Sequence, residues 1–335
     1  MASYSDQHPN PKQSNTMKNM SRRAVLAAAA LPWAAMCQAE GGKPLLLVVG
    51  APPGSAPDAR ARWLADKLGA ATGQAMVVDN RPAGAGNLAA AAVARAAADG
   101  NTLLLAHQGL LAINPHLFAR PGFDALVDFA PIARLGVGPL VLVAGPQTPV
   151  RNLAELVQLA KSRPGELSFG SPAIGSPPYL ATELMRSMAG IEVLHIPMGQ
   201  LTVQQLIGGQ LAFAMDSAVV MLPHIQTGRL RALAVTGRRR LATLPDVPTL
   251  DEAGLPGYQY ESWMGVVAPA GTPGSTVQRL NREISSILKT DEARAWFAMQ
   301  GAEPGDQSVE AFTVFVHDEH AKAGRLIRQL GLRIE

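Results

Sequence analysis

Residues 43–68 read KPLLLVVGAPPGSAPDARARWLADKL. An apolar run rich in leucine and valine comes first, a segment of glycine and proline follows, and apolar residues then recur with helical spacing from Asp58 onward. This order predicts a buried strand, a tight loop and an amphipathic helix. Because glycine lets the backbone approach a ligand and free N–H groups at a helix start attract anions, the loop is a candidate anion-binding site.

A second loop of the same kind occupies residues 168–178, SFGSPAIGSPP, again between an expected strand and an expected helix. It adds the hydroxyl groups of Ser171 and Ser176 to its backbone N–H groups. Two such helix starts that face each other would hold a carboxylate from both sides. The alternative is that each loop is only a tight turn.

The rest of the chain repeats the alternation of short apolar runs with helical spacing, which predicts an α/β fold with mainly parallel sheets. The expected strands cover residues 43–49, 75–78, 102–106, 140–144, 167–169, 191–196, 211–215, 231–235 and 263–268. The expected helices cover residues 58–68, 87–98, 153–163, 178–188, 202–207, 275–288 and 308–330. Residues 237–260 are rich in proline and glycine and are expected to form a long surface segment.

Other chemistries find little support in the sequence. A Gly-x-Gly at residues 84–86 imitates a dinucleotide fingerprint, but residues 79–83 separate it from the expected strand. No nucleophile elbow, zinc-protease motif or Walker loop is present, and the histidines are scattered. His195 ends an apolar strand, where a structural role is expected. Asp216 follows the strand at 211–215, and strand ends of this kind face the ligand crevice in α/β sheets; its alternative is an ordinary turn cap.

Composition sets the class of protein. The chain has 335 residues, 47% hydrophobic and 16% charged, enough for a packed core and about two domains at roughly 150 residues each. The net charge of +3 comes from residues 1–39, since the remainder holds 25 basic and 25 acidic residues. A nucleic-acid binder carries a basic excess on its folded domain, so none is expected as a partner. The lone cysteine, Cys37, excludes a disulfide framework and a cysteine zinc site.

Residues 21–39, SRRAVLAAAALPWAAMCQA, have the parts of an export signal peptide. A basic start precedes an apolar run at 24–35, which is too short to span a bilayer, and small residues follow. We expect cleavage after Ala39 and a periplasmic mature protein. The paired arginines fit the twin-arginine route as well as the general one. Residues 1–16 read as an upstream extension, because Met17 and Met20 are both suitable starts.

The glycine loops belong to a longer series of blocks that resembles the Bug-type receptors, the extracytoplasmic binding proteins of tripartite tricarboxylate transporters. The resemblance runs from about Lys43 to the C-terminus, and the blocks fall in the family's order. They comprise Pro53-Gly54-x-x-x-Asp58, Val78–Pro82 with Gly84–Gly86, Ala112–Leu117, Asp128–Ile132, Leu230–Thr236, Leu244–Thr249 and Ala268–Pro273.

The resemblance implies a two-lobed periplasmic-binding-protein fold of the Venus flytrap type. Residues 40–137 plus 266–335 would form the first lobe and residues 138–265 the second. It also implies a protein that binds a small carboxylate, delivers it to membrane transporter subunits, and acts as a monomer without catalytic residues, metal or cofactor. Two alternatives stay open: a module that presents its ligand to a sensor kinase, and an exported hydrolase, which would need a serine–histidine pair in the cleft.

The ligand-binding residues are assigned from the two loops and from the resemblance. They are Pro53, Gly54, Ser55, Asp58, Gln108, Ser171, Ile174, Gly175, Ser176 and Asp216. The chain departs from the family pattern at Ser55, Ile174 and Pro178, and the segment after Pro197 is about two residues short. These departures predict a pocket that is less polar than usual on the second-lobe side, and a ligand with one carboxylate and an apolar or aromatic body.

Overall fold

The computed structural model describes residues 43–305 and 307–334, so the expected signal peptide at residues 1–39 lies outside the described residues. The strands of the described part form a ten-stranded sheet in which the main path runs β2-β1-β3-β9-β4-β7-β5-β6. Their bounds are β1 (Leu45–Val49), β2 (Met76–Asn80), β3 (Thr102–His107), β4 (Phe129–Ala144), β5 (Ser168–Ser171), β6 (Leu194–Pro197), β7 (Phe213–Ser217), β8 (Arg231–Val235), β9 (Glu261–Pro269) and β10 (Glu303–Pro304).

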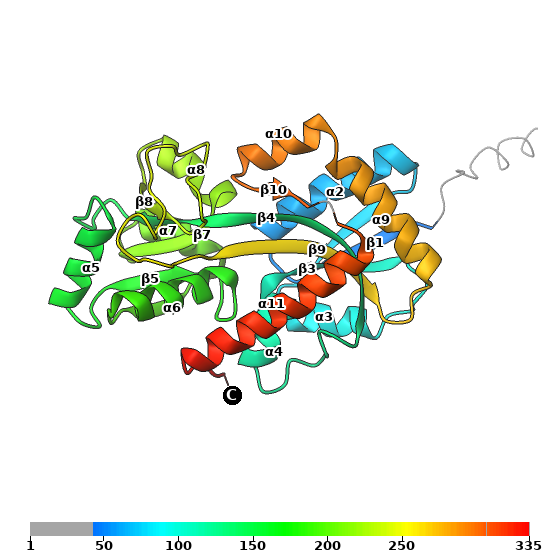
Figure 1. Cartoon of the computed structure of the whole chain (residues 1–335), viewed down its shortest axis with the longest axis horizontal. Helices are drawn as coiled ribbons and strands as arrows, with labels where there is room; N and C mark the ends of the chain where they lie inside the picture. Colours follow the sequence, from blue (N-terminus) through cyan, green and yellow to red (C-terminus); the bar gives the residue numbers. More distant parts are fainter. Residues whose placement is uncertain (1–42, 306, 335) are drawn as a thin grey trace, which may run out of the picture. The chain divides into compact units, whose positions relative to one another are not determined.

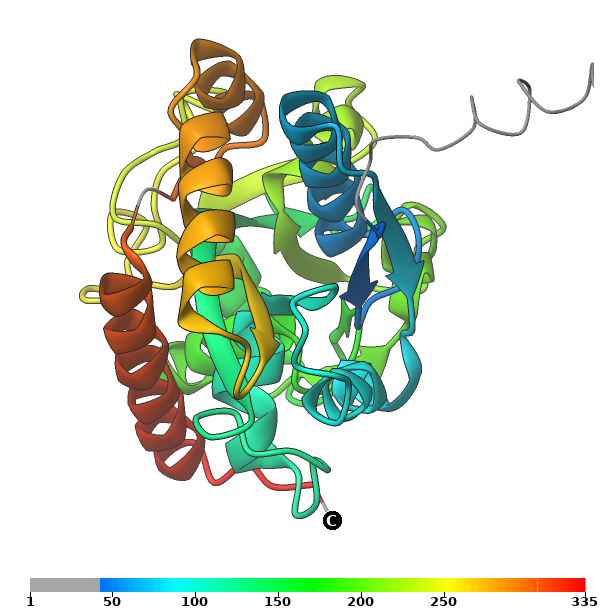
Figure 2. The same cartoon turned by 90° about the vertical axis from the view of Figure 1, so that its right-hand side faces the viewer.

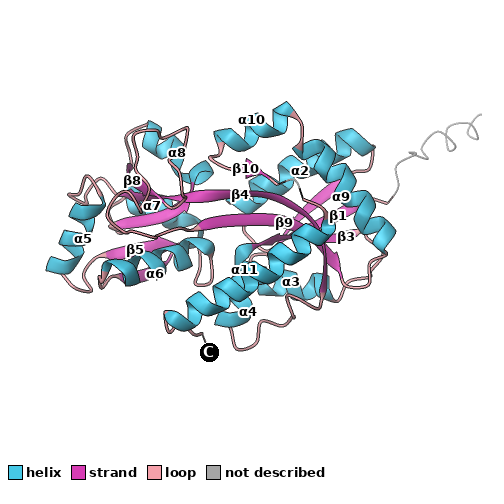
Figure 3. Cartoon of the chain, in the orientation of Figure 1, coloured by secondary structure: helices cyan, strands magenta, loops and turns pink. Residues whose placement is uncertain are grey.

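The parallel strands lie in two groups with two long antiparallel strands between them. β1 pairs in parallel with β2 and β3, and β5 pairs in parallel with β6 and β7. β9 is antiparallel to β3 and to β4, and β4 is antiparallel to β7, β8 and β10. The 16-residue strand β4 therefore extends from one group to the other, as Figures 1 and 3 show.

Helices cover both faces of the sheet. Their bounds are α2 (Ala56–Thr72), α3 (Asn87–Ala94), α4 (Asn114–Leu117), α5 (Leu153–Ser162), α6 (Pro177–Ala189), α7 (Thr202–Ile207), α8 (Ala218–Gln226), α9 (Gly274–Leu288), α10 (Asp291–Met299) and α11 (Val309–Gln329). Short helical turns span Ala83–Gly86, Gly109–Ile113 and Gly199–Leu201. Figure 2 shows α2 above and α3 below the first group of strands, with α9 and α11 to their left.

The core follows from the alternation of side chains along the strands. Leu47 and Val49 of β1 pack with Leu64 of α2 and Ile284 of α9, all of them fully buried. Val48 belongs to the cluster on the opposite face, with the alanines of α3 and Phe312 of α11. A third cluster joins β4 and β7 to α7 and α8. The predicted α/β class is confirmed.

Several elements differ from the expectation drawn from the sequence, β4, α8 and α10 among them. β4 begins at Phe129, eleven residues before the expected strand, because Pro131, Gly136 and Pro139 are rare inside strands and dilute the pattern. The glycine is required there, since a Cβ at residue 136 would lie 2.4 Å from the Phe297 ring. Helices α8 and α10 were not expected, and α8 even contains a proline, Pro223.

Candidate functional site

A cavity of about 740 Å³ lies where the carboxyl ends of β1, β3, β5 and β7 come together. Its volume falls in the range of roughly 300–1,000 Å³ that is typical of small-molecule sites. Gly54 and Gly175, one from each of the two loops that the sequence singles out, both line it. The loops therefore face a common space, with the middle of β4 and of β9 contributing Leu140 and Met264 to the lining.

The loop after β1 is held by hydrogen bonds to its own carbonyl groups. Asn80 Nδ2 donates to the carbonyl of Ala51 at 3.0 Å, and Ser55 Oγ donates to the carbonyl of Pro52 at 2.7 Å. Ser55 is also the N-cap of α2, where its hydroxyl oxygen accepts from the N–H of Asp58. Ser55 and the first turn of α2 line the cavity, so this helix begins at the site.

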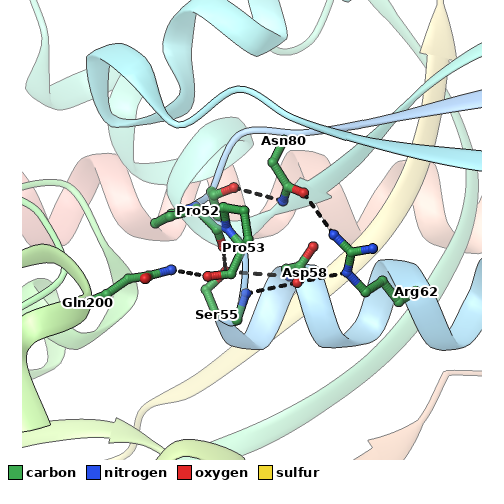
Figure 4. A network of polar contacts seen from close by, with 9 residues as sticks. Pro52, Pro53, Ser55, Asp58, Arg62, Asn80 and Gln200 are labelled. Atoms are coloured by element: carbon green, nitrogen blue, oxygen red, sulfur yellow. Dashed lines mark hydrogen bonds and ion pairs between the residues drawn. The ribbon is translucent and has the colours of Figure 1, made fainter.

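Asp58 anchors the loop after β1 without lining the cavity itself (Figure 4). Its Oδ2 accepts the N–H of Gly54 at 2.8 Å and Arg62 Nε at 3.0 Å, and Arg62 also donates to Asn80 Oδ1 at 3.3 Å. Asp58 is 3% exposed and is not among the lining residues. Burial would raise the pKa of the carboxyl, but the hydrogen bonds from Arg62 and Gly54 outweigh it and lower the pKa. The N–H of Gly54 is thus engaged by the protein itself.

The loop after β5 forms the facing wall. Gly175 has φ +86°, and a Cβ at that position would lie 2.4 Å from Asn114 Oδ1, so glycine is required for backbone conformation and for space. Ser176 is the N-cap of α6 and donates its hydroxyl to the carbonyl of Ala173 at 2.6 Å. Ala173, Gly175 and Ser176 all line the cavity.

Backbone N–H groups are available on both walls. Within residues 43–305 and 307–334 no hydrogen-bond acceptor is found for the N–H groups of Ala56, Ala173 and Gly175, three residues that line the cavity. The N–H of Ala56 is one of the first helical groups of α2, which have no intrahelical partner. An anion between the walls could accept hydrogen bonds from these groups.

Ser171 and Ile174, two of the expected ligand residues, are outside the cavity lining. Ser171 is 0% exposed, and its Oγ lies 2.7 Å from His195 Nε2. The His195 ring contacts Phe169 and Tyr179, and burial lowers its pKa to about 4. Ile174 packs against the buried cluster that contains Phe169 and Tyr179. The serine–histidine pair therefore exists, but its hydroxyl group is enclosed by protein.

Asp216 lines the cavity at the end of β7, as the sequence predicts for a strand end. Its Oδ1 accepts the N–H of Ser217 at 2.7 Å and the Ser217 hydroxyl at 3.3 Å. Burial raises the pKa of Asp216 to about 6, because desolvation disfavours the charged form. Ser217 precedes α8, so a third helix begins at the cavity.

The electrostatics of the lining come from helix ends rather than from cationic side chains. The N-termini of α2, α6 and α8 lie at the cavity, and each carries a partial positive charge. Among the described lining residues there is no lysine or arginine, and Asp216 is the one carboxyl group. His107 and His224 complete the titratable set, and burial lowers the pKa of both, to about 4 for His107.

Gln200 joins the two walls. It lies in the short helical turn before α7, lines the cavity, and donates its side-chain amide to the carbonyl oxygen of Pro53 (Figure 4). The shortened segment after Pro197 is the one sign of this feature in the sequence. Pro53, an expected ligand residue, is outside the lining and is instead the acceptor of this contact.

Gln108 lies away from the cavity lining. Its Nε2 donates to Glu319 Oε2 at 3.1 Å, and the same oxygen accepts Trp263 Nε1 at 3.2 Å. This bond ties the end of β3 to α11. The structure thus brings Gly54, Ser55, Gly175, Ser176 and Asp216 together around one cavity and leaves the other five expected residues behind or beside it.

Two absences apply to residues 43–305 and 307–334. In that part of the chain, no group of three or more histidine, cysteine, aspartate or glutamate side chains could hold a metal ion. The helices of the same residues include none that is long and apolar enough to cross a membrane.

Comparison with known proteins identifies similar chains over most of the length. The family model for the tripartite tricarboxylate transporter family receptor matches residues 60–332. Protein BugT of Bordetella pertussis is 35% identical over 296 residues, which cover 88% of this chain and 91% of BugT. A protein of R. palustris solved with adipate superposes with a TM-score of 0.84 at 34% identity, covering 87% of this chain and 98% of that one. The periplasmic binding protein BugD superposes with a TM-score of 0.82 at 29% identity, covering 87% and 99%.

These comparisons confirm the resemblance that the sequence blocks indicate. They also confirm the fold as that of the periplasmic binding proteins, in which two α/β lobes enclose the ligand site.

Proposed function

Because this chain belongs to the receptor family of the tripartite tricarboxylate transporters, we propose that it captures a small carboxylate in the periplasm and delivers it to the membrane subunits of such a transporter. One observation carries the proposal: the helix starts at Ser55 and Ser176, from the two loops that the sequence singles out, line the same cavity. The R. palustris relative with adipate supports a carboxylate as the ligand class.

The carboxylate is bound by N–H groups and helix ends. Each helix N-terminus stabilises a nearby anion by about 0.3–1 kcal/mol, and the N–H groups of Ala56, Ala173 and Gly175 add direct hydrogen bonds. Ordered water bridges the remaining gaps at little cost. No chemistry is involved, so the protein acts as a receptor and not as an enzyme.

Capture proceeds by closure of two lobes. We assign residues 40–137 plus 266–335 to the first and 138–265 to the second, with β4 and β9 as the connections between them. Ligand contacts to both lobes form only when the lobes are together, and they shift the population toward the closed state. The Gln200–Pro53 contact, which joins segments of the two proposed lobes, belongs to that state.

Export of the chain completes the proposal. The residues up to Ala39 direct it across the inner membrane and are removed there. BugD, with 29% identity, is a periplasmic binding protein, which supports this location. The mature protein acts as a monomer.

The ligand has a largely apolar body. The wall formed by α7, α8 and the middle strands presents Leu140, Val203, Val219, Val220 and Met264 to the cavity. Apolar lining of this kind favours an alkyl or aryl group through burial, at about 25 cal/mol per Å². This supports the expectation of a less polar pocket; of the two departures behind it, Pro178 lines the cavity and Ile174 does not.

A hydrolase is the second candidate, because Ser171 and His195 form a hydrogen-bonded pair. At neutral pH a histidine with a pKa near 4 is uncharged and able to accept a proton. However, a substrate carbonyl must reach the serine oxygen, and Ser171 is 0% exposed. The wild type and Ser171→Ala should show equal, background hydrolysis of p-nitrophenyl acetate; hydrolysis that is lost in the variant would establish the enzyme.

A charge placed on the cavity wall tests the receptor proposal. A thermal-shift screen of mono- and dicarboxylates with two to eight carbons first identifies ligands, which are then titrated calorimetrically. Ala173→Asp adds a carboxylate beside the proposed anion position, whereas Ala173→Asn adds the same volume without charge. Repulsion of about 3–4 kcal/mol at close range should weaken binding by about a hundredfold or more in the aspartate variant alone. Equal affinity of the two variants, or a screen without any stabilising carboxylate, would overturn the proposal.

A further inference from the structure

Asp216 is an acid on the wall of a cavity that is otherwise suited to an anion. One of its oxygens, Oδ1, is engaged by the N–H and hydroxyl groups of Ser217. No hydrogen-bond partner is found for Oδ2 within the described residues, and Asp216 lines the cavity. The neighbouring lining residues Leu140, Val219 and Val220 are apolar. The free oxygen is therefore a charged acceptor on this wall that a ligand can address, with Ser217 and His224 as the nearby polar lining residues.

No charged side chain on the neighbouring elements compensates the charge of Asp216. The titratable side chains on the elements that pack against β7 are Tyr179, Glu183 and Arg186 of α6, His224 of α8 and Arg134 of β4. None of them shifts the pKa of Asp216, which is raised by burial and lowered only by the hydrogen bonds from Ser217. His107, which also lines the cavity, is uncharged at neutral pH because burial lowers its pKa.

On the premise of the proposed function, we infer that Asp216 selects the second polar group of the ligand. It accepts a hydrogen bond from a hydroxyl or ammonium group and rejects a second carboxylate. The preferred ligand is thus a monocarboxylate with a hydrogen-bond donor at its other end, joined by an apolar chain that lies against the wall of α8 and β4.

The discrimination follows from charge. The N–H groups of Ala56, Ala173 and Gly175 compensate one carboxylate, and no cationic side chain in the described lining compensates another. A second carboxylate beside an ionised Asp216 meets like-charge repulsion in a partly desolvated space. A hydroxyl group at the same place gains a charge-assisted hydrogen bond instead. Dicarboxylates bind only when a proton is shared between the ligand and Asp216.

This coupling gives a pH dependence with a definite sign. The protonated form of Asp216 becomes populated as the pH falls through about 6. Affinity for a dicarboxylate should therefore rise on acidification, whereas affinity for a hydroxy acid should not. A variant without an ionisable group at residue 216 loses this difference.

The experiment uses ligands of equal length that differ at one end: adipate, 6-hydroxyhexanoate and hexanoate, with succinate and 4-hydroxybutanoate as a shorter pair. Calorimetric titration at pH 7.5 and 5.5 compares the wild-type protein with Asp216→Asn. Asp246→Asn, at an exposed residue outside the cavity lining, is the matched control. Asp216→Asn is titrated at the same two pH values. Its affinities therefore show how much of the pH dependence comes from ionisation of the ligands themselves.

At pH 7.5 we expect the wild type to bind the hydroxy acid of the better length at least about tenfold tighter than the matching dicarboxylate. Between pH 7.5 and pH 5.5, the affinity of the wild type for adipate or succinate should rise about tenfold more than the affinity of Asp216→Asn does. Asp216→Asn should lose the preference and Asp246→Asn should keep it. If Asp216→Asn does not fold, Asp216→Ser and the wild-type pH profile give the same comparison.

The possible failures are distinguishable. Tighter wild-type binding of the dicarboxylate at pH 7.5, or an unchanged preference in Asp216→Asn, overturns the role of Asp216 while the receptor proposal stands. Absence of binding by every acid in both proteins and at both pH values overturns both.

Discussion

Gln200, in the turn before α7, donates a hydrogen bond from its side-chain amide to the carbonyl oxygen of Pro53, in the loop after β1. The two residues are separated by 147 positions and come from opposite walls of the cavity. The contact therefore forms only when the walls are close together.

Replacement of Gln200 by alanine should weaken ligand binding mainly through faster dissociation. A hydrogen bond of this kind contributes about 0.5–1.5 kcal/mol, which corresponds to roughly two- to tenfold in affinity. Dissociation rates from stopped-flow fluorescence check the expectation, with Gln226→Ala, at an exposed position of α8, as the control. Equal dissociation rates in wild type and Gln200→Ala would show that the contact has no part in closure.

Replacement of Asp58 by alanine should lower the free energy of unfolding by about 1.5–3 kcal/mol at pH 7, since hydrogen bonds from Arg62 and Gly54 to a buried carboxylate are lost. Ligand affinity should fall as well, because the loop after β1 loses its anchor. Asp66→Ala, an exposed acid on the same helix, is the control. Urea denaturation of Asp58→Ala and Asp66→Ala measures the two changes in the free energy of unfolding.

The effect of Asp58 has a pH dependence whose sign is fixed by its lowered pKa. A depressed carboxyl pKa contributes stability above the unfolded value of about 3.9, and this contribution disappears as the pH falls through the folded value. The difference between wild type and Asp58→Ala should therefore shrink toward pH 3. A difference that stays constant from pH 7 to pH 3 would assign the loss to packing instead.

Replacement of Gly175 by alanine should destabilise the fold more than replacement of Gly165. Both glycines have positive φ, +86° and +75°, which costs alanine about 1–2 kcal/mol. Only at Gly175 does the new Cβ meet a neighbour, Asn114 Oδ1 at 2.4 Å, whereas the space around Gly165 is open. The clash adds about 1–3 kcal/mol. Thermal unfolding of the two variants under the same conditions measures the loss of stability of each. Equal losses would mean that Asn114 moves aside.

The sequence predicted the strand–loop–helix units on which the site is built. In residues 43–68 a strong apolar run, and in residues 167–178 a short one, is followed by glycine and proline and by a serine N-cap, and each signal acts over a few residues. The existence and type of such elements can therefore be inferred without knowledge of the rest of the chain. The cavity position of Gly54, Gly175 and Asp216 followed from the same pattern.

What the sequence did not predict depends on distant contacts. The roles of Arg62 and Asn80 rest on hydrogen bonds to each other across 18 residues, and that of Gln200 on one across 147. Helix α8 forms despite Pro223, because Met221 and Leu222 are buried against β4 and β7. Tertiary packing there outweighs local propensity.

The most direct measurement of the central claim is a titration of ¹⁵N-labelled protein with a stabilising carboxylate, followed through the amide resonances. A carboxylate held between the two loops should shift the resonances of Ala56, Ala173 and Gly175 together, with one dissociation constant that equals the calorimetric value. Saturable binding that leaves these three amides unchanged would contradict the account.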